Sequence, residues 1–166
     1  MLDRRTALTL LAASTALPTA ALAKTPREVW WEDLIPPGVP YSEIIGEGDM
    51  DIENDTWAPI YDANGIKLNE DLDGAYIKMP GFILPFEVTA QGVVDFMLVP
   101  YVGACIHTPP PPANQLVVAN VQTPWPTDQL WDAVWVTGTM RTQLQSTAFG
   151  QTGYSIGVDE IELYVW

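Results

Sequence analysis

The stretch AVWVTGTMR, residues 133–141, decides the class of fold that we expect. Its side chains alternate in the way that is typical of a strand with one buried face. Gly138 stands in the middle of the run, where a strongly bent strand needs a residue without a side chain. A bent, alternating strand of this kind favours a small β-barrel or a β-sandwich.

Four other runs have the same character and are separated by glycine and proline. The first of them carries an irregularity at Pro80-Gly81. The four runs are 75–88, 92–102, 114–122 and 154–166. Together the five runs predict an all-β fold, a small OB-like Greek-key barrel formed by residues 73–166. Residues 127–135 and 141–151 could each hold a helical turn, and no run is long enough for a substantial helix.

Residues 24–72 form a different region, which is acidic, rich in proline and without sustained periodicity. Its large apolar residues, such as Trp30, Trp31 and Leu34, argue against a disordered linker, because disordered segments contain few aromatic residues. We expect an N-terminal extended arm that packs over the barrel and includes a short turn of helix around Glu28–Leu34.

Residues 1–23 have the pattern of a secretory signal peptide. Arg4 and Arg5 precede a short apolar stretch, and the Ala-Leu-Ala sequence of residues 21–23 is a cleavage signal, so the mature chain is expected to begin at Lys24. The paired arginines favour the twin-arginine route, while the general route stays open because residues 6–8 depart from the twin-arginine pattern. We therefore expect a periplasmic or otherwise exported protein, with no transmembrane segment in the mature chain.

The chain is strongly acidic. Its net charge is −14, and loss of the leader, which holds two arginines and one aspartate, takes the charge to −15. Proteins that bind nucleic acid need clustered Lys and Arg side chains, so we expect no nucleic-acid partner. An anionic membrane surface would also repel this chain.

The segment CIHTPPPPANQ, residues 105–115, holds the only cysteine and the only histidine of the chain. In an extended backbone, Cys105 and His107 point to the same face and lie about 6.6 Å apart. A thiolate together with an imidazole suits zinc or copper. Two alternatives stay open: the pair fills the core, or His107 activates Cys105 as a nucleophile. No other enzyme signature is present, and we assign no catalytic residue.

A metal site at this pair needs further ligands, because two residues do not complete a coordination shell. Glu87 and Asp95 are candidates, and Met97 and Met140 are others for a softer ion. Proline fixes the backbone and side-chain amides bond to it, so the loop that follows is expected to hold the pair rigidly. The residues of this loop support are Pro109, Pro110, Pro111, Pro112, Asn114 and Gln115.

Recognition of a partner protein is a third hypothesis. A run of prolines is a ligand for aromatic-lined grooves. The tryptophans that could line such a groove, or alternatively fill the core, are Trp125, Trp131, Trp135 and Trp166.

Several segments together resemble a known family: WEDLIPPG (31–38), IKMPGFILPFE (77–87), FMLVPYVGACIHTPPPPANQLVVANV (96–121) and WVTGTM (135–140). They are similar to the exported bacterial proteins classed as domain of unknown function 3299. The resemblance implies a compact β-rich domain, no established catalytic activity, and an association with ABC-type transport components and metal-homeostasis genes. We therefore expect an exported accessory binding protein that handles a transition metal, zinc or copper, through Cys105 and His107. The alternative is a protein-interaction component, without metal, of an envelope ABC-type transport system.

Overall fold

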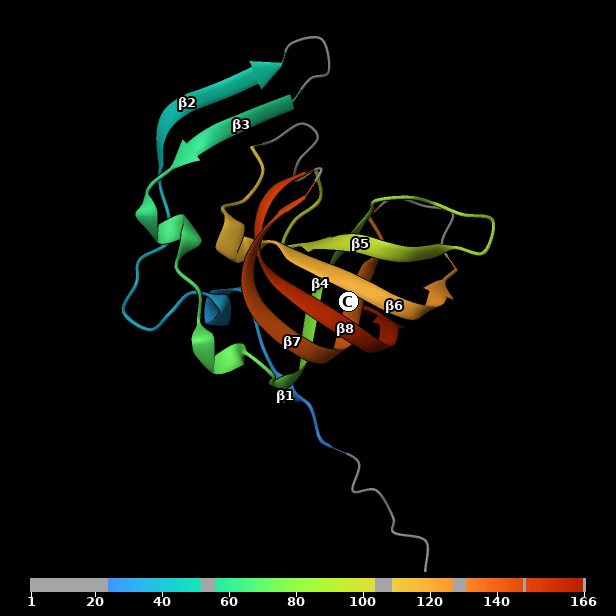
Figure 1. Ribbon diagram of the computed structural model, residues 1–166. Coiled ribbons are helices and arrows are strands. Elements are labelled where there is room, and N and C mark those ends of the chain that lie inside the picture. Colours follow the sequence, from blue (N-terminus) through green and yellow to red (C-terminus); the bar gives the residue numbers. More distant parts are fainter. Residues whose placement is uncertain (1–23, 52–55, 104–108, 127–130, 148, 166) are drawn as a thin grey trace, which may run out of the picture.

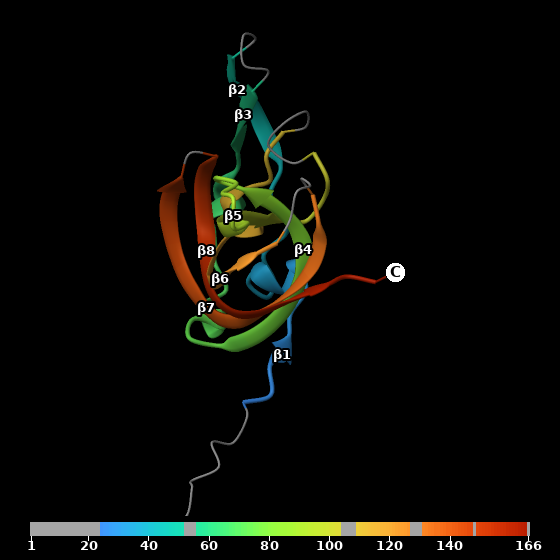
Figure 2. The same ribbon diagram turned by 90° about the vertical axis from the view of Figure 1, so that its right-hand side faces the viewer.

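Five strands close into a barrel (Figures 1 and 2). The computed structural model describes residues 24–51, 56–103, 109–126, 131–147 and 149–165. The barrel strands are β4 (Tyr76–Pro85), β5 (Val93–Val99), β6 (Val117–Trp125), β7 (Ala133–Thr147) and β8 (Gly150–Leu163). Hydrogen bonds join them in the order β4-β5-β6-β8-β7 and back to β4, and within the barrel only β6 and β8 run parallel. The predicted all-β, OB-like Greek-key barrel is confirmed.

Gly138 marks a bend in β7. The pairing of β7 with β8 shifts register between Thr137 and Gly138, and such shifts bend a strand and increase its twist. A Cβ atom on Gly138 would lie against the carbonyl oxygen of Gly157 on β8. The bend predicted at this glycine is therefore present, and the closeness of the two backbones excludes a side chain there.

β4 runs through Pro80-Gly81 without a break. Its first part, Tyr76–Phe82, pairs with β7, and its last part, Phe82–Pro85, pairs with β5. This single strand closes the barrel because it changes its partner at Phe82.

The helical turn suggested for residues 141–151 is wrong. β7 continues to Thr147 and the chain enters β8 at Gly150, so most of this stretch is strand. Pairing with β8 satisfies the backbone of these residues, and this outweighs a weak local preference for helix. Residues 131–135 contain no helix either, while 127–130 lie outside the described residues. In the part of the chain that the structure describes, no helix is long and apolar enough to cross a membrane.

The N-terminal arm forms short elements of its own and packs along the barrel. These are β1 (Arg27–Glu28), the 3₁₀ turns η1 (Trp31–Leu34), η2 (Ala63–Ile66) and η3 (Glu70–Leu72), and the strands β2 (Ile44–Asp51) and β3 (Thr56–Tyr61). β1 pairs in parallel with β4, and η1 confirms the expected helical turn. β2 and β3 form a hairpin that stands clear of the barrel (Figures 1 and 2), where the sequence predicted only extended chain.

One buried tyrosine fastens the arm to the barrel. The hydroxyl of Tyr154, on β8, donates a hydrogen bond to the carbonyl oxygen of Leu34 (2.5 Å) and accepts one from the backbone N–H of Asn69 (2.6 Å). Leu34 and Leu72 of the arm are themselves fully buried in the barrel core. Burial raises the pKa of Tyr154 to about 12, so the hydroxyl keeps its proton and its role as donor.

A second apolar cluster lies apart from the barrel interior. Its fully or nearly buried members, which come from β4, from β5 and from the residue before β6, are Leu84, Met97, Val99 and Leu116. Trp131 and Phe149 pack against them, and Phe149 stacks on Phe86 with ring centroids 5.3 Å apart. The β5 members alternate with interior residues, so they point to the outside of the barrel. OB barrels commonly bind ligands on the face of their second and third strands, which here are β5 and β6, and in this chain aromatic side chains cover part of that face.

Candidate functional site

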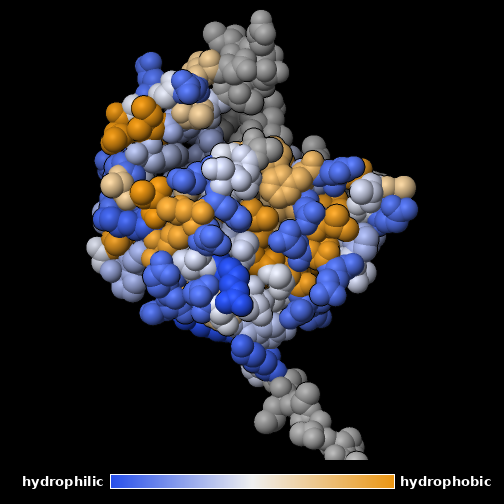
Figure 3. Space-filling view, in the orientation of Figure 1, coloured by the Kyte–Doolittle hydropathy of each residue, from blue (hydrophilic) through white to orange (hydrophobic). Residues whose placement is uncertain are grey.

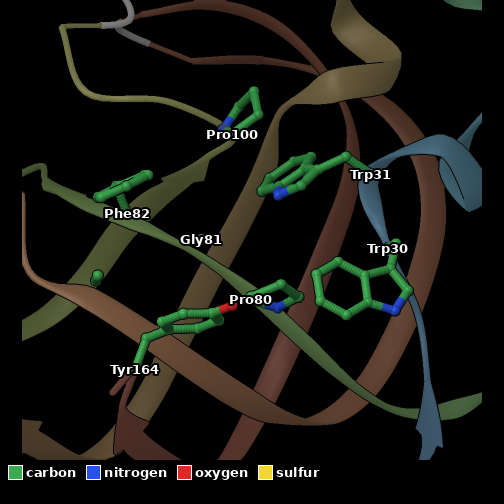
Figure 4. A pocket seen from close by; sticks show the side chains of 8 residues that line it. Trp30, Trp31, Pro80, Gly81, Phe82, Pro100 and Tyr164 are labelled. Carbon is green, nitrogen blue, oxygen red and sulfur yellow. The ribbon is translucent and has the colours of Figure 1, made fainter. Parts of the chain in front are cut away.

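A pocket lined by aromatic rings and prolines opens beside β4 (Figure 4). Its volume is about 210 Å³. The lining residues come from the arm, from β4 and β7, and from the segments that follow β5 and β8. They are Trp30, Trp31, Pro80, Gly81, Phe82, Pro100, Ala133 and Tyr164. None of them carries a charge, so the pocket suits an apolar group.

The start of the arm places the two tryptophans. The N–H of Val29 donates to the carbonyl oxygen of Lys78 on β4 at 2.9 Å, and Val29 is fully buried. Trp30 follows with 42% of its surface exposed. Its backbone N–H donates to Oδ2 of Asp33 in η1 at 2.8 Å, and Trp31 packs against the barrel core. The backbone on both sides of the two rings is therefore fixed.

Contacts between aromatic rings hold the lining of the pocket in place. Trp30 meets Trp135 edge to face, with centroids 5.5 Å apart, and Trp135 stacks on Tyr164 at 5.4 Å. Nζ of Lys78 lies 5.6 Å from the centroid of Trp135, and the same ammonium group pairs with Glu162. Such contacts stabilise the rings beyond their burial. Trp135 does not line the pocket, but it holds two of the rings that do.

Gly81 lies at the centre of the pocket (Figure 4). A Cβ atom on this residue would come within 2.6 Å of Cγ of Leu98 and 3.0 Å of Cζ2 of Trp31. A side chain would therefore displace one of these two residues. The glycine allows Trp31 to lie against β4 and form the pocket wall.

The predicted metal ligands Cys105 and His107 lie outside the described residues, so their pairing stays a prediction. The proline run behind them is held at two of its carbonyl groups. The Tyr101 hydroxyl donates to Pro109 O at 3.1 Å, and the Tyr61 hydroxyl donates to Pro110 O at 2.9 Å. Pro111 and Pro112 are buried. The described end of this segment is thus fixed in place.

Asn114 and Gln115 form η4 (Ala113–Gln115) and are almost fully buried. Nδ2 of Asn114 donates to the carbonyl oxygens of Asn64 (2.9 Å) and Lys67 (3.1 Å), and Nε2 of Gln115 donates to that of Trp31 (3.0 Å). The two amides therefore bind the arm, whereas the sequence suggested that they close their own loop.

The candidate additional ligands, Glu87 and Asp95, lie toward the turn that joins β4 to β5, away from Val99 at the end of β5. Glu87 and Asp95 are both exposed, and Oδ1 of Asp95 accepts a hydrogen bond from Nδ2 of Asn120 at 2.6 Å. From Asp95 to Val99, the last residue of β5, the strand rises about 13 Å. Met97 and Met140, the candidates for a softer ion, are fully buried. Among the residues that the structure describes, no three His, Cys, Asp or Glu side chains are grouped to hold a metal ion.

The groove suggested by four tryptophans is present only in part. Trp135 supports the aromatic pocket, whereas Trp131 packs on the second apolar cluster. Nε1 of Trp125 donates to Oδ2 of Asp132 at 3.0 Å. Trp166 lies outside the described residues. The rings that do line the pocket are separated in sequence by most of the chain, and no local pattern marks them as a group.

Residues 31–163 match the family model described as protein of unknown function (DUF3299). A crystal structure of a DUF3299 family protein from Pseudomonas aeruginosa PAO1 is 30% identical, has a TM-score of 0.69, and the match covers 86% of this chain and 99% of that chain. No curated protein matches the sequence significantly. The chain therefore belongs to the DUF3299 family.

Proposed function

We propose that this protein is a non-enzymatic accessory binding protein, and that its aromatic pocket receives a proline-containing, extended segment of a partner protein. The observation that carries the proposal is the pocket lining, which consists of aromatic rings, prolines and small residues without a charge. Proline rings pack well on aromatic faces, and a polyproline II segment loses little entropy on binding because it is already rigid.

The size of the pocket and the net charge of the protein agree with such a ligand. A pocket of about 210 Å³ is smaller than the sites of about 300–1,000 Å³ that enclose drug-sized molecules. It fits one or two side chains of a longer chain that continues over the surface. The net charge of −14 would attract a segment with Lys or Arg beside its prolines.

The variant Trp30→Ala tests this proposal. Trp30 is partly exposed, so its loss should leave the barrel folded while removing one wall of the pocket. We expect the Kd for a labelled polyproline peptide flanked by lysines to rise at least about tenfold, as measured by fluorescence anisotropy. Tyr41→Ala, which removes an exposed ring outside the pocket lining, should bind as the wild type does. Equal binding of a peptide with alanine in place of proline, or unchanged binding by Trp30→Ala, would contradict the proposal.

Metal binding through Cys105 and His107 is the second candidate function. It is supported by the anchored proline run directly behind the pair, because a fixed loop lowers the entropy cost of arranging ligands. Both ligands must lose protons, so the affinity should fall at acidic pH. Elemental analysis of protein purified without a chelator or a histidine tag is expected to find zinc or copper near one equivalent, and none in Cys105→Ser/His107→Ala. Equal metal content in the two proteins would rule this function out.

A further inference from the structure

The β2–β3 hairpin exposes several large apolar side chains. Ile45, Met50 and Ile60 are 67%, 64% and 54% exposed. Among the described residues, β2 and β3 pair only with each other. A two-stranded sheet is marginally stable in water, and large apolar side chains that stay exposed are available for contact with a partner. Figure 3 shows hydrophobic residues beside hydrophilic ones on this projecting part of the molecule.

The charge of the hairpin restricts what can cover it. Glu43, Glu47 and Asp49 are exposed beside the apolar residues. No Lys or Arg occurs between Arg27 and Lys67, so nothing on this part of the chain offsets the acids. A second copy of the chain would bring the same negative charge, and so would a nucleic acid or an anionic lipid surface. The complementary surface is one of Lys and Arg side chains around apolar ones.

Hydrogen bonds within the arm and to the proline run fix the base of the hairpin. Oγ of Ser42 donates to Oδ1 of Asp62 at 2.8 Å, and the N–H of Asp62 donates to the carbonyl oxygen of Glu43 at 3.0 Å. The hydrogen bonds from Ser42 and from the Asn64 N–H hold the pKa of Asp62 below its usual value, so it stays ionised. Tyr61, the last residue of β3, donates to Pro110 of the anchored proline run. The hairpin is thus presented in a fixed position, which lowers the entropy cost of binding.

The edges of the hairpin do not favour addition of another strand. β2 has register shifts around Gly46, and β3 contains Pro59, which has no N–H to donate. Bulges and prolines are the features that blunt an exposed sheet edge. Recognition must therefore use the side chains of the hairpin faces. Met50 and Trp57 are directly opposite partners on one face of the hairpin, whereas Asp49 and Ile60 belong to the other face. A partner must therefore contact the hairpin on both faces.

We propose that the β2–β3 hairpin is a docking arm for a partner protein whose surface presents Lys and Arg side chains around apolar ones. The apolar side chains of Ile45 and Met50 contact the apolar part of that surface, and Glu47 and Asp49 pair with its cations. This docking surface is separate from the aromatic pocket: none of these four residues lines it. The two proposals can therefore fail independently.

The test uses two synthetic probes, an amphipathic peptide of alternating Lys and Leu and a matched peptide of Glu and Leu. The full mature chain is expected to bind the Lys/Leu peptide and not the Glu/Leu peptide, with an affinity that falls as salt is added. Ile45→Ser/Met50→Ser should weaken binding about tenfold or more, because two apolar contacts are lost. Glu47→Gln/Asp49→Asn should weaken binding and flatten the salt dependence. Trp30→Ala should bind like the wild type.

A matched control removes the same charge elsewhere. Asp159→Asn/Glu160→Gln changes two exposed acids on β8 and is expected to leave the Kd unchanged. Equal weakening by this variant would show that binding depends on net charge and would overturn the proposal. It would also be overturned if the Lys/Leu peptide does not bind, if wild-type protein binds phosphatidylglycerol vesicles through the hairpin, or if sedimentation shows self-association that Ile45→Ser/Met50→Ser abolishes. Circular dichroism and thermal melting of each variant confirm that the barrel is intact.

Discussion

Replacing Gly138 with alanine is expected to lower the free energy of unfolding by about 3 kcal/mol or more, the upper range for overpacking in a closed structure. The added Cβ would lie against the carbonyl oxygen of Gly157. This contact is with backbone, so no side chain can rotate away to make room. β7 and β8 would have to separate at the bulge, and Val136 and Met140, both fully buried on β7, would be displaced with them.

Gly157→Ala is the matched control for this prediction. Gly157 belongs to the neighbouring strand, and a Cβ built on it has no other atom within 4 Å. Its substitution should therefore change the free energy of unfolding by less than about 0.5 kcal/mol, as is usual at exposed positions. Urea denaturation of the two variants and the wild type measures both effects. Similar losses in the two variants would mean that the closeness of the strands at Gly138 is not what requires a glycine.

Tyr154→Phe is expected to cost about 2–3 kcal/mol at neutral pH. The substitution leaves the carbonyl of Leu34 and the N–H of Asn69 buried without their partner, and an unsatisfied buried polar group costs about 1–3 kcal/mol. Both of these groups belong to the arm. Proteolysis should therefore cut the arm of the variant faster than that of the wild type.

The same tyrosine predicts how stability changes at alkaline pH. Its pKa is raised from 10.0 to about 12 in the folded protein, so the unfolded chain loses this proton first. The stabilisation is fully present below pH 10 and is lost as the pH rises toward 12. A shift of this size corresponds to roughly 3 kcal/mol, so the difference in unfolding free energy between wild type and Tyr154→Phe should narrow across this interval. The other tyrosines are the same in both proteins and cancel. A difference that stays constant from pH 9 to pH 12 would contradict the assignment.

Aromatic side chains cover part of the outer face of β5 and β6, and this restricts where the barrel can bind a ligand. Trp131 has a φ of 72°, a conformation that bulky residues rarely adopt, and it packs on the second apolar cluster. Because such a conformation costs free energy, the packing of its ring must compensate. Phe82 packs against this cluster and also lines the aromatic pocket, so the cluster supports one wall of the pocket.

The sequence predicted the barrel strands because each strand carries its own local signal. Alternation in residues 133–141 and 154–166 reflects the two faces of a strand, and glycine or proline marks the ends of most runs. The β2–β3 hairpin was not predicted, since β2 has irregular pairing around Gly46 and so lacks a regular alternation. The helical turn predicted within residues 141–151 is wrong for a related reason: pairing with β8 holds the polar residues of this stretch as strand.

By itself, the sequence determined the all-β class, the five barrel strands, the bend at Gly138 and the strongly acidic character of the chain. These follow from local periodicity, from the lack of a side chain at one residue, and from composition. Only the tertiary structure decided that Trp30, Pro100 and Tyr164 share a pocket, and that Tyr154 fastens the arm. Such contacts form when β4 changes partner and the barrel closes, because closure brings together residues that are far apart in the sequence and whose meeting no local pattern encodes.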